Sequence, residues 1–327
     1  MTAYEKSLRF GSWVVVCSLL LRLCSEGYPA KLKTLLIELE TGRNVRSSLS
    51  EPVFDYAPES PPAAQTVPIE TTEAAEAPTP PEPLVFTEAD TVSLYNTSGL
   101  AVDPMALLQQ EITLPSLDGP KVLLYSTHAT ESYTKVRENY IESAAYRTLD
   151  PKYNVLCLGA ALKAELEGRG IETIQDETLH DYPSYNAAYN HSRKSVRQYQ
   201  KDTPSLALIL DLHRDAADTA SGQLRTLANI EGASAAQIML VVGTDARLSN
   251  PDWQENLSLA LKLQALLERI SPGITRPTCL RPQRFNQDLS PGCLLIEIGG
   301  AGNTHEEALA AVPVLAQAIG ELLYRLQ

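Results

Sequence analysis

The chain has 327 residues, 44% of them hydrophobic, which is enough apolar content for one large domain or two ordinary ones. The formal net charge is −13, and no basic stripe with interleaved aromatic residues occurs, so binding to nucleic acid is not expected. The five cysteines, at positions 17, 24, 157, 279 and 293, have no paired spacing, which argues against a disulfide framework and against a cysteine-type zinc site.

The first 26 residues have the character of a targeting segment. Lys6 and Arg9 precede an apolar stretch from Ser12 to Leu21, which Arg22 interrupts. This stretch is shorter than the roughly 20 residues of a membrane-spanning helix and suits the apolar region of a signal peptide, but no clear cleavage site follows. We therefore expect export, with either an uncleaved membrane anchor or a cleaved signal.

Residues 27–117 are expected to form a linker and a lead-in to the folded domain. From about Ser47 to Asp90 the chain is rich in Pro, Glu, Thr and Ala. Such a segment buries too little apolar surface to offset the entropy cost of ordering it, and an extended tether is expected. The folded domain is predicted to span residues 118–327.

Apolar runs of strand length alternate with helical patterns in this C-terminal part. Strands are predicted at Lys121–Thr127, Ile171–Gln175, Leu206–Asp215, Gln237–Gly243 and Cys293–Ile298, and helices at Asn154–Glu167, Ser184–Gln200, Gln254–Ile270 and Thr304–Tyr324. Thr304 and Glu307 have the spacing of a capping box at the start of the last helix. The alternation predicts an α/β fold, a single domain whose mostly parallel central sheet is flanked by helices.

Three of the predicted strands deliver ionisable residues near their carboxyl ends. The apolar run from Leu206 ends with His213, the first strand leads into His128 and Glu131, and the last strand carries Glu297. In open α/β sheets the ligand crevice lies at the carboxyl ends of the strands, so these side chains are expected at one edge of the sheet.

Two neutral imidazoles and one carboxylate suffice to hold a catalytic zinc ion, and a second carboxylate would then act as the base. Nucleophilic catalysis is the competing chemistry. Ser126, Ser132 or Ser290 could pair with His213 and Asp215, but none lies in a Gly-x-Ser-x-Gly turn. A purely structural alternative is that His213 caps a strand and that the neighbouring Arg-Asp pair is solvated.

A series of motifs follows in order along this part of the chain: Thr127-His-Ala-Thr-Glu-Ser-Tyr133, Tyr153-Asn-Val155, His180-Asp-Tyr-Pro-Ser-Tyr-Asn186, Asp211-Leu-His-Arg-Asp215, Gln237-Ile-Met-Leu-Val-Val-Gly-Thr244, Asn250-Pro-Asp-Trp-Gln-Glu-Asn-Leu257, Asn286-Gln-Asp-Leu-Ser-Pro-Gly292, Glu297-Ile-Gly-Gly300 and Asn303-Thr304. With these motifs, the chain from about Lys121 resembles the stage II sporulation protein P family. Members of that family are zinc-dependent N-acetylmuramoyl-L-alanine amidases of endospore-forming Gram-positive bacteria. The chain departs from the family pattern at Ser126, where members often have His, and at Phe285, where they often have Tyr.

The resemblance implies specific roles for the residues of these motifs. His128 and His213 would ligate zinc, and Glu297 would act as general acid and base on the muramoyl amide. Glu131 is the first choice for the third ligand, and the alternatives are Asp150 and His180. From the chemistry of metal sites, Arg214 and Asp215 are candidates to orient the metal site, since ligating His usually donates its other ring nitrogen to a partner, and the alternative is an ordinary surface ion pair. Tyr185, Tyr189, Asn250 and Trp253 are candidates to line the groove for glycan and stem peptide, although Trp253 suits the core equally well.

The resemblance also implies a setting. The amidase would act in septal cell-wall remodelling or engulfment during sporulation, as a single-pass protein of the cell membrane with its catalytic domain outside. Its partners would be a lytic transglycosylase, stage II sporulation protein D, and a membrane scaffold, stage II sporulation protein M. Two alternatives are a catalytically silent cell-wall-binding or scaffold protein with the same fold, and a zinc peptidase that cuts within the stem peptide.

Overall fold

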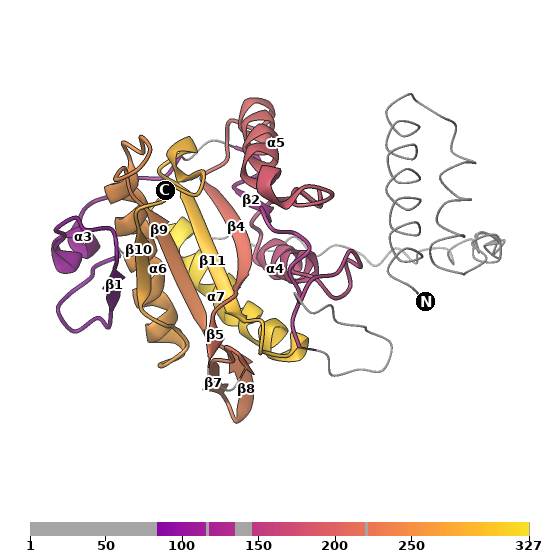
Figure 1. Ribbon diagram of the computed structural model, residues 1–327. Helices are drawn as coiled ribbons and strands as arrows, with labels where there is room; N and C mark the ends of the chain where they lie inside the picture. Colours follow the sequence, from indigo (N-terminus) through magenta and orange to yellow (C-terminus); the bar gives the residue numbers. More distant parts are fainter. Residues whose placement is uncertain (1–83, 116–117, 135–145, 220–221, 327) are drawn as a thin grey trace, which may run out of the picture. The chain divides into compact units, whose positions relative to one another are not determined.

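A computed structural model of the protein describes residues 84–115, 118–134, 146–219 and 222–326 (Figure 1). The expected targeting segment, residues 1–26, and most of the expected linker lie outside the described residues. The described residues all belong to the C-terminal unit of the chain, Ala77–Gln327.

The unit is built on a seven-stranded mixed sheet. In sequence order its strands are β1 (Leu94–Asn96), β2 (Val122–Tyr125), β3 (Thr173–Gln175), β4 (Leu208–Asp215), β9 (Ile238–Gly243), β10 (Thr278–Arg281) and β11 (Cys293–Gly300). Their order in the sheet is β1-β10-β9-β11-β4-β2-β3. All neighbouring pairs are parallel except β9 and β11, which are antiparallel. The predicted α/β fold with a mostly parallel sheet is confirmed, and the β9–β11 pairing divides the sheet into two parallel groups of opposite direction.

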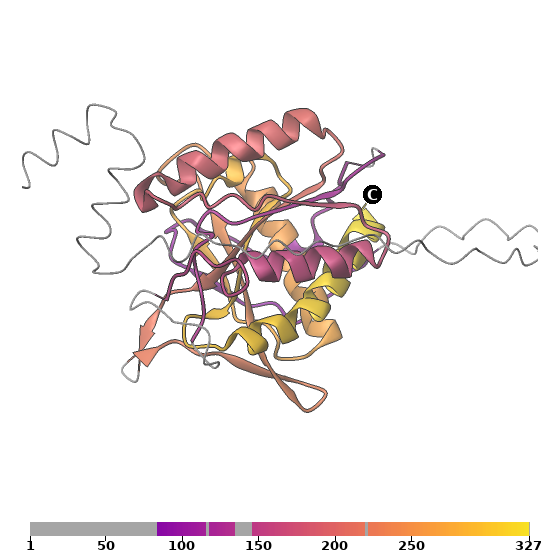
Figure 2. The ribbon, with the colours of Figure 1, turned by 90° about the vertical axis from the view of Figure 1, so that its right-hand side faces the viewer.

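One face of the sheet is covered by three long helices, α4 (Leu156–Glu167), α6 (Trp253–Ile270) and α7 (His305–Leu326) (Figures 1 and 2). The strand residues that pack against these helices are apolar and alternate along each strand, as the period of two in a pleated strand requires. They form the main core of the unit.

The helix α7 begins with the predicted capping box. The Thr304 backbone N–H donates to the Glu307 carboxylate (3.0 Å), and the Glu307 N–H donates to the Thr304 hydroxyl (3.2 Å). Among the described residues, α7 is the one helix long and apolar enough to span a membrane. Because half of its most apolar window is buried inside the fold, where it packs against α4 and α6, it is a core helix of this unit.

On the opposite face lies α5 (Ala188–Asp202), preceded by the short 3-10 helix η2 (Tyr185–Ala187) (Figure 2). A small apolar cluster joins Val196 of α5 to Leu123, Ile209 and Cys293 of the sheet. This cluster covers only part of the face, and the remaining part carries polar side chains.

The folded unit begins before the expected boundary at residue 118. β1 pairs with β10 at the sheet edge, and the helix α3 (Pro104–Gln109), capped by the Asp103 carboxylate, packs against α6. Phe86 and Leu108 are buried in the main core. The segment expected to be a lead-in is therefore part of the sheet and of the core.

Two small hairpins precede β9, namely β5 (Asp218–Thr219) with β6 (Gly222–Gln223), and β7 (Leu227–Ile230) with β8 (Ala233–Ala236). The end of β11 packs closely against the segment between them, and a Cβ at Gly300 would lie 2.4 Å from the carbonyl oxygen of Leu224. The glycines after Glu297 thus allow close backbone packing.

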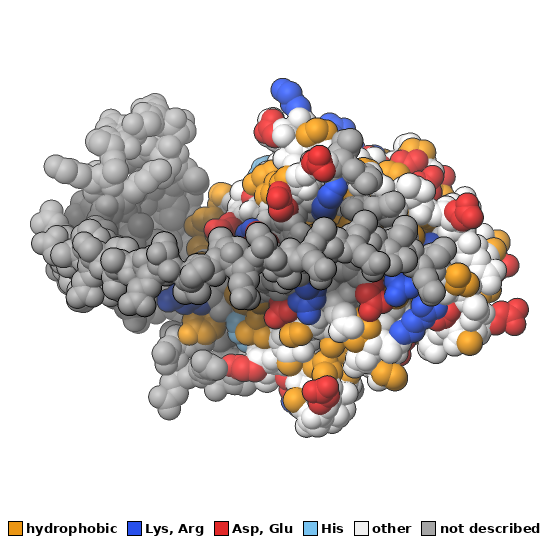
Figure 3. Space-filling model, turned by 180° about the vertical axis from the view of Figure 1, so that it is seen from behind, with side chains coloured by type: hydrophobic (Ala, Val, Ile, Leu, Met, Phe, Trp, Pro, Cys, Tyr) orange, Lys and Arg blue, Asp and Glu red, His pale blue; other side chains and the backbone are white. Residues whose placement is uncertain are grey.

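On the surface seen from behind in Figure 3, basic and acidic side chains are interspersed over the described residues. Neither sign of charge dominates this face of the described residues.

Candidate active site

The register of the sheet brings the predicted residues together. His213 of β4 and Glu297 of β11 are direct partners in the parallel ladder, and Met239 of β9 is the partner of Glu297 on its other side. Residues directly paired on neighbouring strands point to the same face of the sheet, and the side chains of His213, Glu297 and Met239 lie on the face that carries α5. His128 follows β2, the neighbour of β4, at the same end of the sheet.

These residues line one pocket of about 340 Å³. Its polar wall is formed by His128, Glu131, His213, Arg214 and Glu297. Its other wall comes from β9, β11, and β10 with the segment that follows it. This wall is largely apolar, with Met239, Val241, Leu295 and Phe285, and its polar members include Arg281 and Gln283. Such a mixture of apolar lining and a few convergent polar groups is typical of ligand-binding sites.

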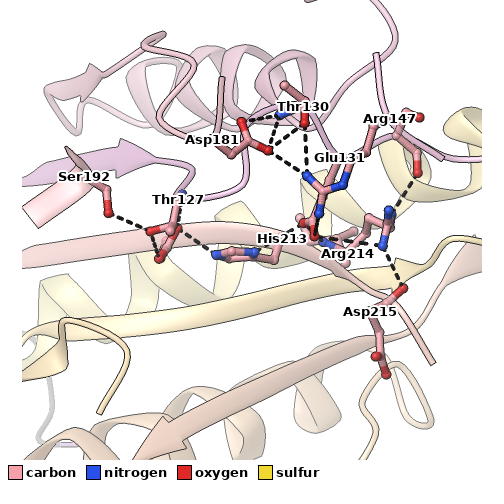
Figure 4. Close-up of polar contacts among 12 residues, drawn as sticks. Thr127, Thr130, Glu131, Arg147, Asp181, Ser192, His213, Arg214 and Asp215 are labelled. Carbon is pink, nitrogen blue, oxygen red and sulfur yellow. Dashed lines mark hydrogen bonds and ion pairs between the residues drawn. The ribbon is translucent and has the colours of Figure 1, made fainter. Parts of the chain in front are cut away.

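Glu131 is held in place by the residues around it (Figure 4). One carboxylate oxygen, Oε2, lies 3.2 Å from Nδ1 of His213 and accepts the backbone N–H of Arg214 at 3.3 Å. The other oxygen, Oε1, is 3.4 Å from Nη2 of Arg147 and 3.9 Å from Nη1 of Arg214. These contacts fix the carboxylate at the bottom of the pocket, beside the His213 ring.

Burial and neighbouring charges shift the pKa values of Glu131, His213 and Glu297. Burial alone would raise the pKa of Glu131, but the hydrogen bond with His213 and the positive charges nearby lower it to about 2. Burial would lower the pKa of His213, yet Asp211 and Glu131 together raise it well above its ordinary value. For Glu297, burial dominates and the negative charge of Glu131 adds to it, so its pKa rises to about 8 although His213 opposes the shift.

His128 is fixed by aromatic rings. Its imidazole stacks on Tyr185, with 4.4 Å between ring centroids and 12° between planes, and meets Tyr189 edge-on at 5.6 Å. The His213 ring lies 5.5 Å away. Burial lowers the pKa of His128, which favours the neutral imidazole that ligates metals.

Asp211 ties the loop after β2 to the sheet. Its carboxylate accepts both the backbone N–H and the hydroxyl of Thr127, each at 2.7 Å, and this hydroxyl is 2.9 Å from that of Ser192 in α5 (Figure 4). One Asp211 oxygen also lies 2.9 Å from Nε2 of His213, without the geometry of a hydrogen bond. The residue next to Thr127 is His128, so this network positions both histidines.

The donor set of the pocket has the chemistry of a metal site. Nδ1 of His128 is buried and makes no hydrogen bond, which is unusual for a native polar atom, and Nε2 of His213 has only the Asp211 oxygen at 2.9 Å. Oε2 of Glu297, beside them, is also buried without a hydrogen bond. Two imidazoles, His128 and His213, and one carboxylate, Glu131, are the kinds of ligand that a catalytic zinc ion takes.

Among the described residues, however, no three His, Cys, Asp or Glu side chains already converge as a metal cluster. The chemistry of the donors therefore fits zinc, whereas convergence on one ion requires the side chains to move from their present positions.

The two alternatives to Glu131 lie elsewhere. His180 is buried and its Nε2 is 3.0 Å from the Asp176 carboxylate, while Asp150 is exposed and accepts the backbone N–H of Lys152. Neither residue lines the pocket.

Arg214 lines the pocket, but its side chain points at backbone carbonyl groups. Nε donates to the Ser132 carbonyl at 2.9 Å and Nη2 donates to the Tyr146 carbonyl at 3.0 Å. This geometry makes Arg214 a positioning residue for the loop that carries Glu131.

Two of the four residues expected to line the groove are placed differently. Tyr185 and Tyr189 contact His128, but Trp253 is buried in the main core and Asn250 is fully buried, where it donates to the Gly243 carbonyl. Trp253 thus takes the core position that its sequence suits equally well, and Asn250, whose carbonyl accepts the Trp253 backbone N–H, lies at the turn that starts α6. The sequence did not reveal Arg147 and Asp181, whose 2.6 Å ion pair joins two loops distant in the chain.

Comparison with known families and proteins places the chain among sporulation proteins. The profile described as Stage II sporulation protein P (SpoIIP) matches residues 68–320. The chain belongs to this family. Stage II sporulation protein P of Bacillus subtilis (strain 168) is 29% identical over 218 residues, which are 63% of this chain and 52% of that protein. The chain thus spans about half the length of this curated relative.

Solved structures with some likeness are amidases. The CwlD amidase from Clostridioides difficile, in complex with the GerS lipoprotein, has a TM-score of 0.39 and 14% identity, over 62% of this chain and 98% of that chain. The N-acetylmuramyl-L-alanine amidase Ami1 from Mycobacterium smegmatis has a TM-score of 0.37 and 12% identity, over 65% and 99%. Likeness at this level adds nothing to the assignment, which rests on the family match.

Proposed function

We propose that this member of the stage II sporulation protein P family is a zinc-dependent peptidoglycan hydrolase that cleaves the amide between N-acetylmuramic acid and L-alanine. The observation that carries the proposal is the pairing of His213 with Glu297 in the ladder, beside His128, with a buried polar atom that makes no hydrogen bond on both His128 and Glu297. A binding protein has no need for a buried carboxylate paired with the His213 imidazole, whereas amide hydrolysis requires a proton acceptor and donor.

In this proposal His128, His213 and Glu131 hold the zinc ion. When bound, the ion would polarise the amide carbonyl and lower the pKa of the attacking water. Glu297 takes a proton from that water and delivers a proton to the leaving nitrogen. The hydroxyl thus joins the lactyl carbonyl carbon, the C–N bond breaks, and L-alanine leaves with a free amino group.

Other residues of the site act through these four. Asp211 holds the loop that carries His128, through Thr127, and Arg214 and Arg147 hold the Glu131 carboxylate. Such supporting contacts set the orientation of metal ligands and of catalytic groups.

The cellular setting is also proposed. The basic flank and apolar stretch of residues 1–26 support attachment to the cell membrane, and the Pro/Glu-rich segment supports a tether to an extracytoplasmic catalytic domain. Family membership supports a role in sporulation, which we take to be septal wall remodelling or engulfment. Stage II sporulation proteins D and M are the proposed partners.

The test is digestion of purified peptidoglycan by the full chain in mild detergent, comparing wild type with Glu297→Gln. The proposal expects released stem peptides with free L-alanine amino termini from wild type only. New amino termini within the stem peptide would indicate a peptidase. Binding to peptidoglycan without release by either protein would indicate a scaffold or cell-wall-binding protein.

A further inference from the structure

A second hollow of about 340 Å³ adjoins the active-site pocket. Leu149, Tyr182 and Tyr185 form its apolar walls, and Thr130, Arg147 and Asp181 are among its polar ones. Leu149, Tyr182 and Tyr185 are 48%, 55% and 53% exposed, which makes them three of the eight large hydrophobic side chains exposed among the described residues. Their gathering around one hollow marks it as a binding surface.

The two hollows share a wall. Tyr185 stacks on His128 of the active-site pocket, and the Arg147 guanidinium carbon lies 4.6 Å from the centroid of the Tyr185 ring. Arg147 also reaches Glu131, at the bottom of the active-site pocket (Figure 4). A molecule bound in the second hollow therefore lies directly beside the proposed reaction centre.

The charges in the second hollow are balanced internally. Arg147 pairs with Asp181 at 2.6 Å and with Glu131 at 3.4 Å, so no positive charge is left over to attract an anion. The Asp181 carboxylate is itself fully occupied, since it also accepts the hydroxyl and the backbone N–H of Thr130. The hollow suits a neutral ligand with apolar faces and hydroxyl groups at its edge.

The substrate of a muramoyl amidase extends to both sides of the scissile bond, a sugar chain on one side and a peptide on the other. Stem peptides carry carboxylates, and Arg281, which has no ion-pair partner among the described residues, lies on the other wall of the active-site pocket. Pyranose rings instead present C–H faces that pack on aromatic rings, and hydroxyl edges that form hydrogen bonds. The second hollow therefore suits the sugar chain of the substrate, and the wall with Arg281 suits the carboxylates of the stem peptide.

We propose that the second hollow binds a hexosamine ring of the glycan strand, packed on Tyr182 and Leu149, while the stem peptide leaves along the Arg281 side. This inference rests on the proposed function for the identity of the substrate, and it assigns the glycan-specificity residues of the same site. Tyr182 is the main platform because its ring makes no hydrogen bond or ring contact with other described residues.

The experiment measures binding of chitotetraose to the full chain in detergent by calorimetry. This uncharged oligosaccharide has no stem peptide and no muramoyl amide, so its binding is independent of hydrolysis. Tyr182→Ala is compared with Tyr95→Ala, an equally exposed tyrosine in β1 at the far edge of the sheet, and Leu149→Ser serves as a second variant. Tyr182→Phe keeps the ring.

The proposal expects wild type, Tyr95→Ala and Tyr182→Phe to bind chitotetraose alike. Tyr182→Ala and Leu149→Ser should bind about tenfold more weakly, the order of an aromatic packing contact. In peptidoglycan digestion the same two variants should raise KM and leave kcat near that of wild type. No binding by wild type, or binding unaffected by both variants, would overturn the proposal.

Failure of the proposed function gives a different pattern. Binding of chitotetraose that depends on Tyr182 and Leu149, without release of L-alanine-terminated peptides by wild type, would reject the amidase and support the glycan site. Release of such peptides, with glycan binding indifferent to Tyr182 and Leu149, would support the amidase and reject the glycan site.

Discussion

Along β4, Leu208, Leu210 and Leu212 contact the core beneath α4, α6 and α7, whereas Asp211 and His213 lie on the face that carries α5. The strand β11 repeats the pattern, with Ile296 in the main core and Glu297 in the pocket. The same strands thus contribute stability through one face and the proposed chemistry through the other. Because strand side chains alternate, a register slip of one residue would exchange the two sets.

This comparison predicts that substitutions on the two faces have separable effects. The largest is expected at Glu297, where Glu297→Gln should reduce kcat on peptidoglycan by about 10²- to 10⁴-fold, the usual contribution of a general acid and base. The urea unfolding midpoint should change little, since Gln has the same shape. Activity within tenfold of wild type would remove Glu297 from the mechanism.

On the face covered by α4, α6 and α7, Leu210→Ala should lower the free energy of unfolding by roughly 2–5 kcal/mol, because Leu210 is fully buried and its loss leaves a cavity. Urea denaturation measures the effect. Leu227→Ala, at a half-exposed position of β7, is the control and should stay within about 0.5 kcal/mol. Equal losses in the two variants would contradict the location of the core.

A smaller effect is expected at the start of α7. Thr304→Ala removes the hydroxyl that accepts the Glu307 N–H and should cost about 1 kcal/mol of unfolding free energy. Thr304→Ser keeps that hydroxyl and should restore most of the stability. The cap belongs to the face covered by α4, α6 and α7, so peptidoglycan digestion at a temperature well below unfolding should be unchanged in both variants.

A further effect concerns pH. Lys262 of α6 is buried, its ammonium group donates to the Leu108 carbonyl and lies 5.3 Å from the Phe86 ring centroid, and burial lowers its pKa to about 8 from 10.5. Between these two values the unfolded chain holds the proton while the folded chain releases it. This group therefore makes the folded state more stable as pH rises through that window.

The measurement is the free energy of unfolding from pH 7.5 to 9.5 in wild type and in Lys262→Met. Cysteines and tyrosines also titrate in this range, so the difference between the two proteins is the informative quantity. As pH rises, the free energy of unfolding of wild type should increase relative to that of Lys262→Met. A difference that stays constant or reverses would show that the ammonium is not desolvated.

Much of the fold could be predicted because the runs that form β4, β9 and β11 are long and apolar, and because Thr304 and Glu307 mark the start of α7. β1 has only three residues, Leu94–Asn96, in a polar setting, and its only partner in the sheet is β10, about 180 residues away. Neither that pairing nor the reversed direction of β9 beside β11 leaves a local trace in the sequence.

The site divides in the same way. The proximity of His128, His213 and Glu297 could be predicted because each lies near the carboxyl end of an apolar strand, and parallel strands bring such ends together. Arg147 and Asp181 lie in polar loops without periodicity, and only folding brings them into contact. For Asn250 and Trp253 the sequence left the choice open, because a motif residue that supports a turn looks the same in sequence as one that binds substrate.

Zinc binding tests the central claim most directly. Calorimetric titration of the metal-stripped chain with zinc should give one site per chain in wild type and in Glu297→Gln, with similar affinity, because Glu297 is assigned to proton transfer and not to the metal. His213→Ala should lose the site. Equal zinc binding by His213→Ala and wild type, or no binding by wild type, would contradict the assignment of this face of the sheet to metal-dependent hydrolysis.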